Sequence, residues 1–118
     1  MLTWVAIIQS IYFIATGIWP LLHLPSFLAV TGPKHDLWLV RTVGVLVFVI
    51  GMSLAVAVQQ HQMSSAIATL AIGSALSLAA ADVIYVARGT IGRIYLLDAF
   101  AEAILIAAWI VGYFVDRA

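Results

Sequence analysis

Long apolar runs separated by short polar breaks dominate the pattern of this chain. A transmembrane helix needs about 20 largely apolar residues, and four runs reach that length: residues 2–24, 37–58, 64–87 and 94–115. Because the runs are continuous rather than alternating, they do not fit the strands of a transmembrane β-barrel. The pattern therefore predicts an all-α integral membrane protein, a four-helix bundle that forms a single transmembrane domain over residues 1–118.

Composition agrees with this class and narrows the partners. Of the 118 residues, 65% are hydrophobic and 8% are charged, whereas soluble domains carry roughly 25% charged residues. Five Lys and Arg residues balance five Asp and Glu residues, so there is no net positive charge to hold a phosphate backbone, and we expect no nucleic acid partner. The chain has no cysteine, which excludes disulfides and thiolate metal sites. The lipid bilayer is the partner that the composition predicts.

The connection between the first two runs, residues 25–36, is too apolar for an ordinary loop and too short to cross a membrane. We expect an interfacial or re-entrant segment there, limited by Pro25 and Pro33. Asp36 is placed to cap the helix that follows. The segment is either a flap that controls access to the bundle or a simple cover over its end, and both interpretations stay open.

The basic residues predict an orientation. With four spans, both termini lie on one side of the membrane. Lys34, Arg41, Arg88 and Arg93 lie at or near the other side, whereas the side of the termini carries only Arg117. Because cytoplasmic loops are enriched in Lys and Arg, we predict a multi-pass protein of the inner (plasma) membrane with both termini non-cytoplasmic.

Four ionisable side chains fall inside the predicted spans: Arg41, Asp82, Asp98 and Glu102. At a rise of 1.5 Å per residue, the first three lie roughly 6–9 Å below the same surface, opposite the termini, and Glu102 lies about 12 Å below it. Asp98 and Glu102 are four residues apart and share one helix face. Because charged groups in a membrane are costly, we expect all four to face the bundle interior. His23, with Gln9 and Thr16 on one stripe of the first span, reaches the same side.

Three carboxyl groups that share one guanidinium cannot all ionise cheaply in an apolar site. We therefore expect at least one of them, Glu102, to be protonated near neutral pH. Glu102→Gln should then be tolerated, whereas Asp98→Asn and Arg41→Ala should destabilise the fold by leaving a charge unpaired. The cluster is either a ligand or proton site or only a set of contacts between helices.

Glycines and other small residues predict where helices approach closely. In the second span Arg41, Gly44, Phe48 and Gly51 follow one seam, and its two glycines allow a neighbouring helix to come near. The third span is rich in Gly, Ser and Ala before Asp82. We expect that helix to be packed centrally or against a second copy of the chain.

Catalytic and metal-binding motifs are absent. The chain contains no G-x-S-x-G, H-E-x-x-H, P-loop or G-x-G-x-x-G pattern. No helix carries a His pair or an E-x-x-H pair at ligand spacing, so we predict no metal site. Whether the protein is an enzyme stays open.

Two sequence stretches carry a family resemblance: GIWPLLHLPSF at residues 17–27 and RTVGVLVFVIG at residues 41–51, followed by an acidic residue near the start of the fourth span. In length, span order and these stretches the chain resembles the DoxX-like group of small bacterial four-helix membrane proteins. A few relatives in that group are linked to quinone-coupled sulfur oxidation. The resemblance therefore implies a membrane redox accessory role with a quinone as the cofactor to consider.

Three functions stay open. The leading hypothesis is that the protein binds a small amphiphile, such as a quinone or lipid, or protons. Transport of the bound species is left open, and a homodimer would offer room for a path. Arg41 would hold a polar or anionic head, Asp82 would orient Arg41, and Asp98 and Glu102 would exchange protons, with His23 nearby. The apolar part of the site would be lined by Trp19, Phe48 and Trp109. The alternatives are a structural or accessory subunit of a membrane complex and a membrane-embedded acid/base enzyme.

Overall fold

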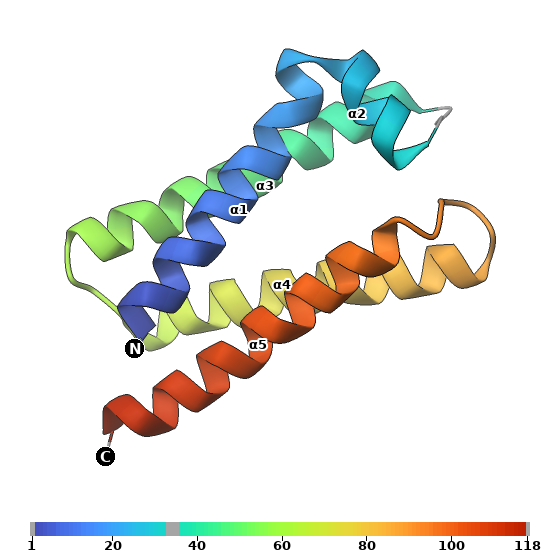
Figure 1. Ribbon diagram of the computed structural model, residues 1–118. Helices are drawn as coiled ribbons and strands as arrows, with labels where there is room; N and C mark the ends of the chain where they lie inside the picture. Colours follow the sequence, from blue (N-terminus) through green and yellow to red (C-terminus); the bar gives the residue numbers. More distant parts are fainter. Residues whose placement is uncertain (1, 33–35, 118) are drawn as a thin grey trace.

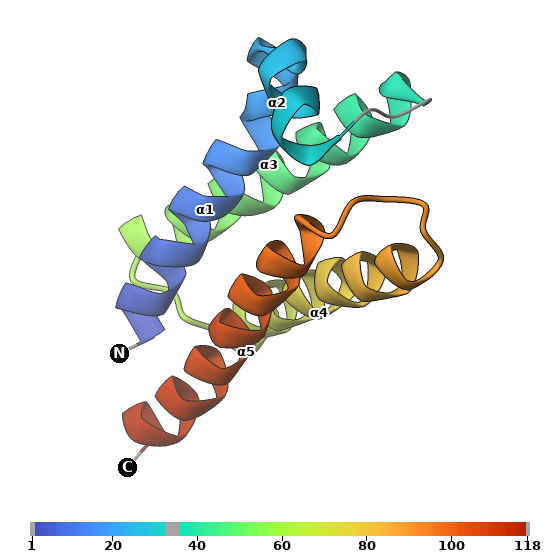
Figure 2. The same cartoon turned by 45° about the vertical axis from the view of Figure 1, so that its right-hand side comes forward.

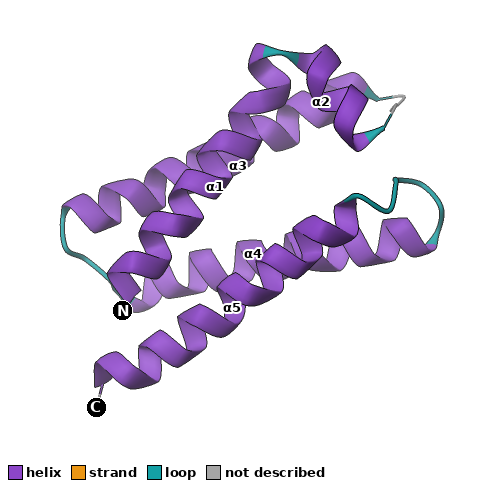
Figure 3. Cartoon of the chain, in the orientation of Figure 1, coloured by secondary structure: helices purple, strands orange, loops and turns teal. Residues whose placement is uncertain are grey.

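The computed structural model describes residues 2–32 and 36–117, and in these ranges the only regular elements are helices (Figure 3). Their bounds are α1 Leu2–Leu22, α2 Leu24–Thr31, α3 Leu37–Gln59, α4 Ser65–Ala87 and α5 Tyr95–Arg117. Four of them, α1, α3, α4 and α5 up to Val115, are long and apolar enough to cross a membrane. The all-helical class and the four candidate spans are confirmed, and the protein is a multi-pass membrane protein.

The helix ends follow local chemistry. Ser64 accepts a hydrogen bond from the Ile67 N–H through its hydroxyl and starts α4. Gly32 ends α2 with a φ of +96°, a conformation that favours glycine. Asp36 occupies the residue before α3, but its side chain makes no capping hydrogen bond. The predicted carboxylate cap at that helix is therefore wrong, and the Asp36 backbone carbonyl accepts the first helical bonds instead.

The helix α1 packs along α3 (Figure 1) because glycines remove the side chains at their crossing. A Cβ added at Gly17 of α1 would lie 2.6 Å from the Gly44 carbonyl oxygen of α3, and one added at Gly44 would lie 2.7 Å from the Gly17 oxygen. A Cβ on Gly51 would lie 2.9 Å from the backbone nitrogen of Ile14. The predicted glycine seam is confirmed, and the helix that approaches it is α1.

The second pair consists of α4 and α5, which lie side by side in both ribbon views (Figures 1 and 2). Of the four spans, α4 has the smallest buried share. A Cβ added at its Gly73 would meet nothing within 4 Å. Of the two predicted positions for this small-residue helix, the central one is wrong, because most of its surface is unburied although it contacts α5 and, less extensively, α3. Packing against a second copy of the chain stays a prediction.

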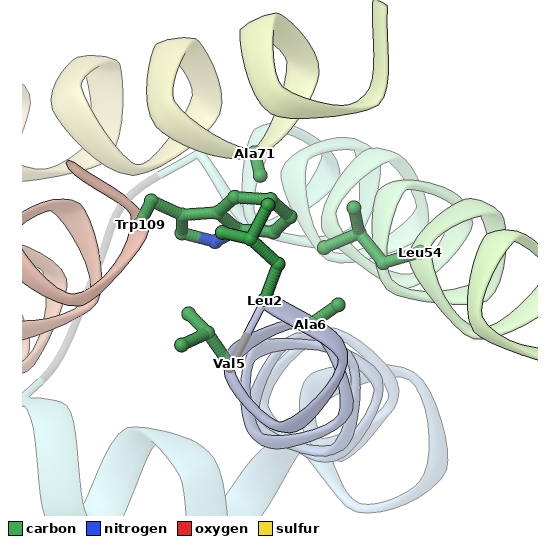
Figure 4. Close-up of a cluster of buried hydrophobic side chains, with 6 residues drawn as sticks. All are labelled: Leu2, Val5, Ala6, Leu54, Ala71 and Trp109. Atoms are coloured by element: carbon green, nitrogen blue, oxygen red, sulfur yellow. The ribbon is translucent and has the colours of Figure 1, made fainter. Parts of the chain in front are cut away.

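The two pairs meet at the end that holds the termini. Trp109 of α5 lies there among small and aliphatic side chains (Figure 4), in a buried cluster with Leu2, Val5, Ala6, Leu54 and Ala71. Further along, Phe13, Val47 and Leu105 form a second buried cluster. Beyond it, the α1–α3 and α4–α5 pairs diverge toward the end where α2 lies (Figures 1 and 2).

The predicted interfacial segment contains the short helix α2, which folds back beside the end of α1. The Trp19 indole N–H donates to the Ser26 hydroxyl at 2.8 Å, and the Trp19 and Phe27 rings stack edge to face at 5.3 Å. At its other end α2 reaches α5, since the Thr31 and Tyr95 side chains are hydrogen bonded. Residues 33–35 of the predicted segment, including Pro33 and Lys34, lie outside the described residues.

Candidate functional site

A cavity of about 750 Å³ occupies the space between the two diverging helix pairs. We call it the cleft. Its walls are mostly apolar, and all five helices contribute to them. The lining residues on the helices are Tyr12, Thr16, Gly17, Trp19 and Pro20 of α1, Phe27, Val30 and Thr31 of α2, Leu39, Val40, Val43, Gly44 and Val47 of α3, Leu78 and Tyr85 of α4, and Tyr95, Leu97, Asp98 and Glu102 of α5. The cleft is therefore a hydrophobic space with acidic groups on one wall.

The acidic groups of the cleft wall come from α5. Asp98 lies in the first turn of that helix and Glu102 one turn later, so both side chains project toward the cleft. The predicted common face of these two residues is confirmed. Tyr12 of α1 reaches across and donates its hydroxyl hydrogen to Asp98 Oδ1. This bond joins the two helix pairs at the level where they begin to diverge.

Asp82 of α4 completes the cluster. Its carboxyl group is close enough to that of Asp98 for the two charges to interact, although Asp82 does not line the cleft itself. Two carboxyl groups this close form a favourable contact only when one proton lies between them, because two neighbouring negative charges repel. Asp82, Asp98, Glu102 and Tyr12 together are called the acidic cluster below.

Burial makes the acidic cluster unusual. Glu102 is fully buried, and neither of its carboxyl oxygens has a hydrogen-bond partner. Asp82 is 6% exposed, and its Oδ2 also lacks a partner. A carboxyl group removed from water without a partner is costly, and an ionisable residue inside a membrane is by default a candidate functional residue. The cluster therefore holds three buried acceptor atoms that a proton or a bound group could satisfy.

The structure does not bring Arg41 into this cluster. Its side chain is exposed, and within residues 2–32 and 36–117 it makes no ion pair with Asp82, Asp98 or Glu102. Arg41 lies one turn into α3, where a long side chain can extend to the membrane surface. The expected pairing of one guanidinium with three carboxyls is absent from this arrangement.

His23 also lies apart from the carboxyls. It is exposed at the residue before α2, where its Nδ1 accepts from the Ser26 backbone N–H at 3.2 Å. The side chain thus stabilises the start of a helix, as capping residues do. Among the described residues no group of three or more His, Asp or Glu side chains is arranged to hold a metal ion.

The three aromatic residues expected in the pocket have three different positions. Trp19 lines the cleft. Phe48 lies at the α1–α3 crossing, where its backbone approaches Gly17. Trp109 is 1% exposed in the core at the opposite end, and its indole N–H donates to Gln9 Oε1 at 2.6 Å. Only Trp19 is therefore placed to touch a molecule in the cleft.

Sequence reasoning missed Tyr12, which supplies the one hydroxyl donor to the described carboxyls of the cluster. A signal was present, because Tyr12 lies three residues after Gln9 and four before Thr16. Residues at these spacings share a helix face, and that face was already marked by polar groups. A tyrosine among them was the local indication of a hydrogen bond inside the membrane.

Comparison with known protein families, with curated proteins and with solved structures finds no match for this chain. Its function must therefore be argued from the cleft and the acidic cluster. That arrangement combines a mostly apolar cavity with neighbouring carboxyl groups, which can exchange protons or bind a polar group.

Proposed function

We propose that the protein binds a small amphiphile within the membrane, with the apolar part of the molecule in the cleft and its polar head against the acidic cluster. The observation that carries the proposal is the position of Glu102, a residue that borders a cavity of about 750 Å³ and whose carboxyl group is fully buried and unpartnered. Ligand sites are typically concave and mostly apolar, with a few polar groups that fix orientation. The cleft has this composition.

In this proposal α2 is the interfacial segment that covers the cleft. It contributes Phe27, Val30 and Thr31 to the lining. It is tied to α1 through Trp19 and to α5 through Tyr95, which belong to the two different helix pairs. A helix held to both walls is placed to control entry, and movement of α2 would open the cleft to the bilayer or to the membrane surface.

The proposed roles differ from the expected ones for Arg41 and Asp82, and Tyr12 is added. Asp98, held by Tyr12, and Glu102 contact the head of the ligand and exchange protons with it, while Asp82 shares a proton with Asp98. Arg41 has no role in the proposed site because its side chain is exposed.

The test compares two valine positions on α3. Val43 and Val45 are 48% and 44% exposed, but only Val43 lines the cleft. Val43→Trp should fill the cleft, whereas Val45→Trp should place the same bulk against lipid. Native mass spectrometry of the gently extracted proteins should show a bound apolar molecule on the wild type and on Val45→Trp, and none on Val43→Trp.

Two results would contradict the proposal. Equal retention of the molecule by both tryptophan variants would place it outside the cleft. A clean subunit mass for the wild type would remove the ligand altogether. Together with a stoichiometric protein partner, that second result would favour an accessory subunit, and the weakly buried face of α4 would be the first place to look for the contact.

A further inference from the structure

The acidic cluster has acceptors but almost no donors. From α1 it is faced by Tyr12, from α4 by Asp82, and from α5 by Asp98 and Glu102. Toward the mouth the cleft also carries the phenols of Tyr85 and Tyr95. The residues that α2 and α3 contribute to the lining include no titratable group. The described site therefore contains three carboxyl groups and no positive charge.

The basic residues nearest in the fold lie elsewhere. Arg41, Arg88 and Arg93 are all exposed, and none makes an ion pair within the part of the chain that the structure describes. The hydroxyl of Tyr12 is occupied by Asp98. The two oxygens of Glu102 and the Oδ2 of Asp82 have no partner at all. What the site lacks is a positively charged group.

Deepening the proposed function, on which this inference rests, we propose that the amphiphile is a lipophilic cation and that the carboxyl group of Glu102 is its counter-ion. An anionic head would place a second negative charge beside the one that Asp82 and Asp98 share, in a low-dielectric site, which is strongly unfavourable. A neutral head would leave the carboxyls as they are. A cation lets Glu102 ionise with its charge compensated, in the manner of other buried ion pairs.

The exchange conserves charge and atoms. Without ligand, Glu102 carries a proton on its carboxyl group. When a cation enters, the O–H bond breaks, the proton leaves to water through the mouth of the cleft, and the carboxylate pairs with the cation. One positive charge replaces another, so the net charge of the site does not change. Binding that releases one proton strengthens up to about tenfold for each unit of pH increase.

The experiment uses two ions that have the same shape and opposite charge. Tetraphenylphosphonium and tetraphenylborate differ only in the central atom and the sign of the charge. Their affinities for the detergent-solubilised full chain are measured by equilibrium dialysis between pH 6 and pH 8, for the wild type and for four variants: Glu102→Gln, Asp36→Asn, Val43→Trp and Val45→Trp. Asp36 is the matched carboxyl control because it is exposed and lies outside the cleft.

The expected result is that the wild type binds the cation at least about tenfold more tightly than the anion, with an affinity that rises with pH. Glu102→Gln should remove both the charge preference and the pH dependence, while Asp36→Asn and Val45→Trp should behave as the wild type. Val43→Trp should abolish binding. If Glu102→Gln does not fold, the charge preference and pH dependence of the wild type still decide the matter.

The two proposals fail in different ways. Anion binding as tight as cation binding, or cation binding that does not change with pH, together with loss of binding in Val43→Trp, would keep the amphiphile site and overturn the cation. Absence of binding of either ion would overturn the cation, while the native mass spectrometry comparison would still decide the proposed function. Equal binding of the cation by Val43→Trp and Val45→Trp would overturn the cation and contradict the proposed function as well.

Discussion

Trp109 of α5 donates its indole N–H to Gln9 Oε1 of α1 at 2.6 Å, and the Gln9 amide in turn donates to the Ala71 carbonyl oxygen of α4 at 3.0 Å. Gln9 and Trp109 are 0% and 1% exposed. The Gln9 side-chain amide therefore links α1, α4 and α5 at the end of the molecule that holds the termini, and both its oxygen and its nitrogen are hydrogen bonded. Hydrogen bonds between helices in a membrane stabilise packing, but modestly.

Replacing Gln9 by Leu should lower the free energy of unfolding by about 1–2 kcal/mol, because the buried indole N–H loses its acceptor. The measurement is unfolding in mixed detergent micelles. Gln59→Leu, at the exposed end of α3, is the control and should change little. The double variant Gln9→Leu, Trp109→Phe should lose less than the sum of the two single variants, and strict additivity would show that the bond contributes nothing.

Glycine positions at the α1–α3 crossing should tolerate no side chain. In Gly17→Ala the new Cβ would lie 2.6 Å from the Gly44 carbonyl oxygen and from the Phe48 backbone nitrogen, so the helices must separate. We expect a loss of about 1–3 kcal/mol in the unfolding free energy. Gly73→Ala on α4 is the matched control, because its Cβ would meet nothing within 4 Å. Equal stability of the two alanine variants would contradict the crossing.

Arg41→Ala should destabilise the protein less than Tyr12→Phe, although counting charges in the sequence predicts a large effect for Arg41. Arg41→Ala removes an exposed side chain and should change the unfolding free energy by less than about 0.5 kcal/mol. Tyr12→Phe removes the donor to Asp98 and should lower it by about 1–2 kcal/mol. Tyr85→Phe serves as the control, since Tyr85 is 44% exposed. A larger loss in Arg41→Ala would restore Arg41 to the acidic cluster.

A cross-link can test whether α2 covers the cleft. A Cβ placed on Gly92 would lie 3.6 Å from the Thr31 carbonyl oxygen. The chain has no cysteine of its own, so the pair Thr31→Cys, Gly92→Cys can be oxidised without competing thiols. After oxidation, we expect neither thiol to react with maleimide, because the two form a disulfide. A bound probe should then exchange more slowly than before oxidation. The pair Thr31→Cys, Ser64→Cys is the control, since Ser64 starts α4 at the other end. Cross-linking of the control alone would contradict the arrangement.

Much of the architecture could be predicted from local pattern. The apolar runs end where α1, α3, α4 and α5 end, within two residues, because a membrane span depends on the length and hydropathy of its own segment. The shared face of Asp98 and Glu102 follows from helix periodicity alone. The close approach at Gly44 and Gly51 also follows from residue size. Each of these statements concerns one helix and needs no knowledge of its neighbour.

Statements that involve two helices were harder to predict. Gly44 faces α1 and is buried, whereas Arg41, three residues earlier, lies on the flank of that face and is exposed. A sequence pattern assigns both to one stripe because their angular separation is small. Which side of the membrane the termini occupy depends on loop charge rather than on how the helices pack, so the orientation of the termini stays a prediction.

By itself, the sequence determined that the chain is a helical multi-pass membrane protein with carboxyl groups inside its spans. Only the tertiary structure decided that Tyr12, rather than Arg41, meets Asp98, that Trp109 is bonded to Gln9, and that the cleft opens between the two helix pairs. The physical reason is that lipid and protein interior are equally apolar, so hydropathy does not mark which face of a transmembrane helix turns inward. Rotation and pairing of the helices depend on packing and on buried hydrogen bonds between residues far apart in the chain.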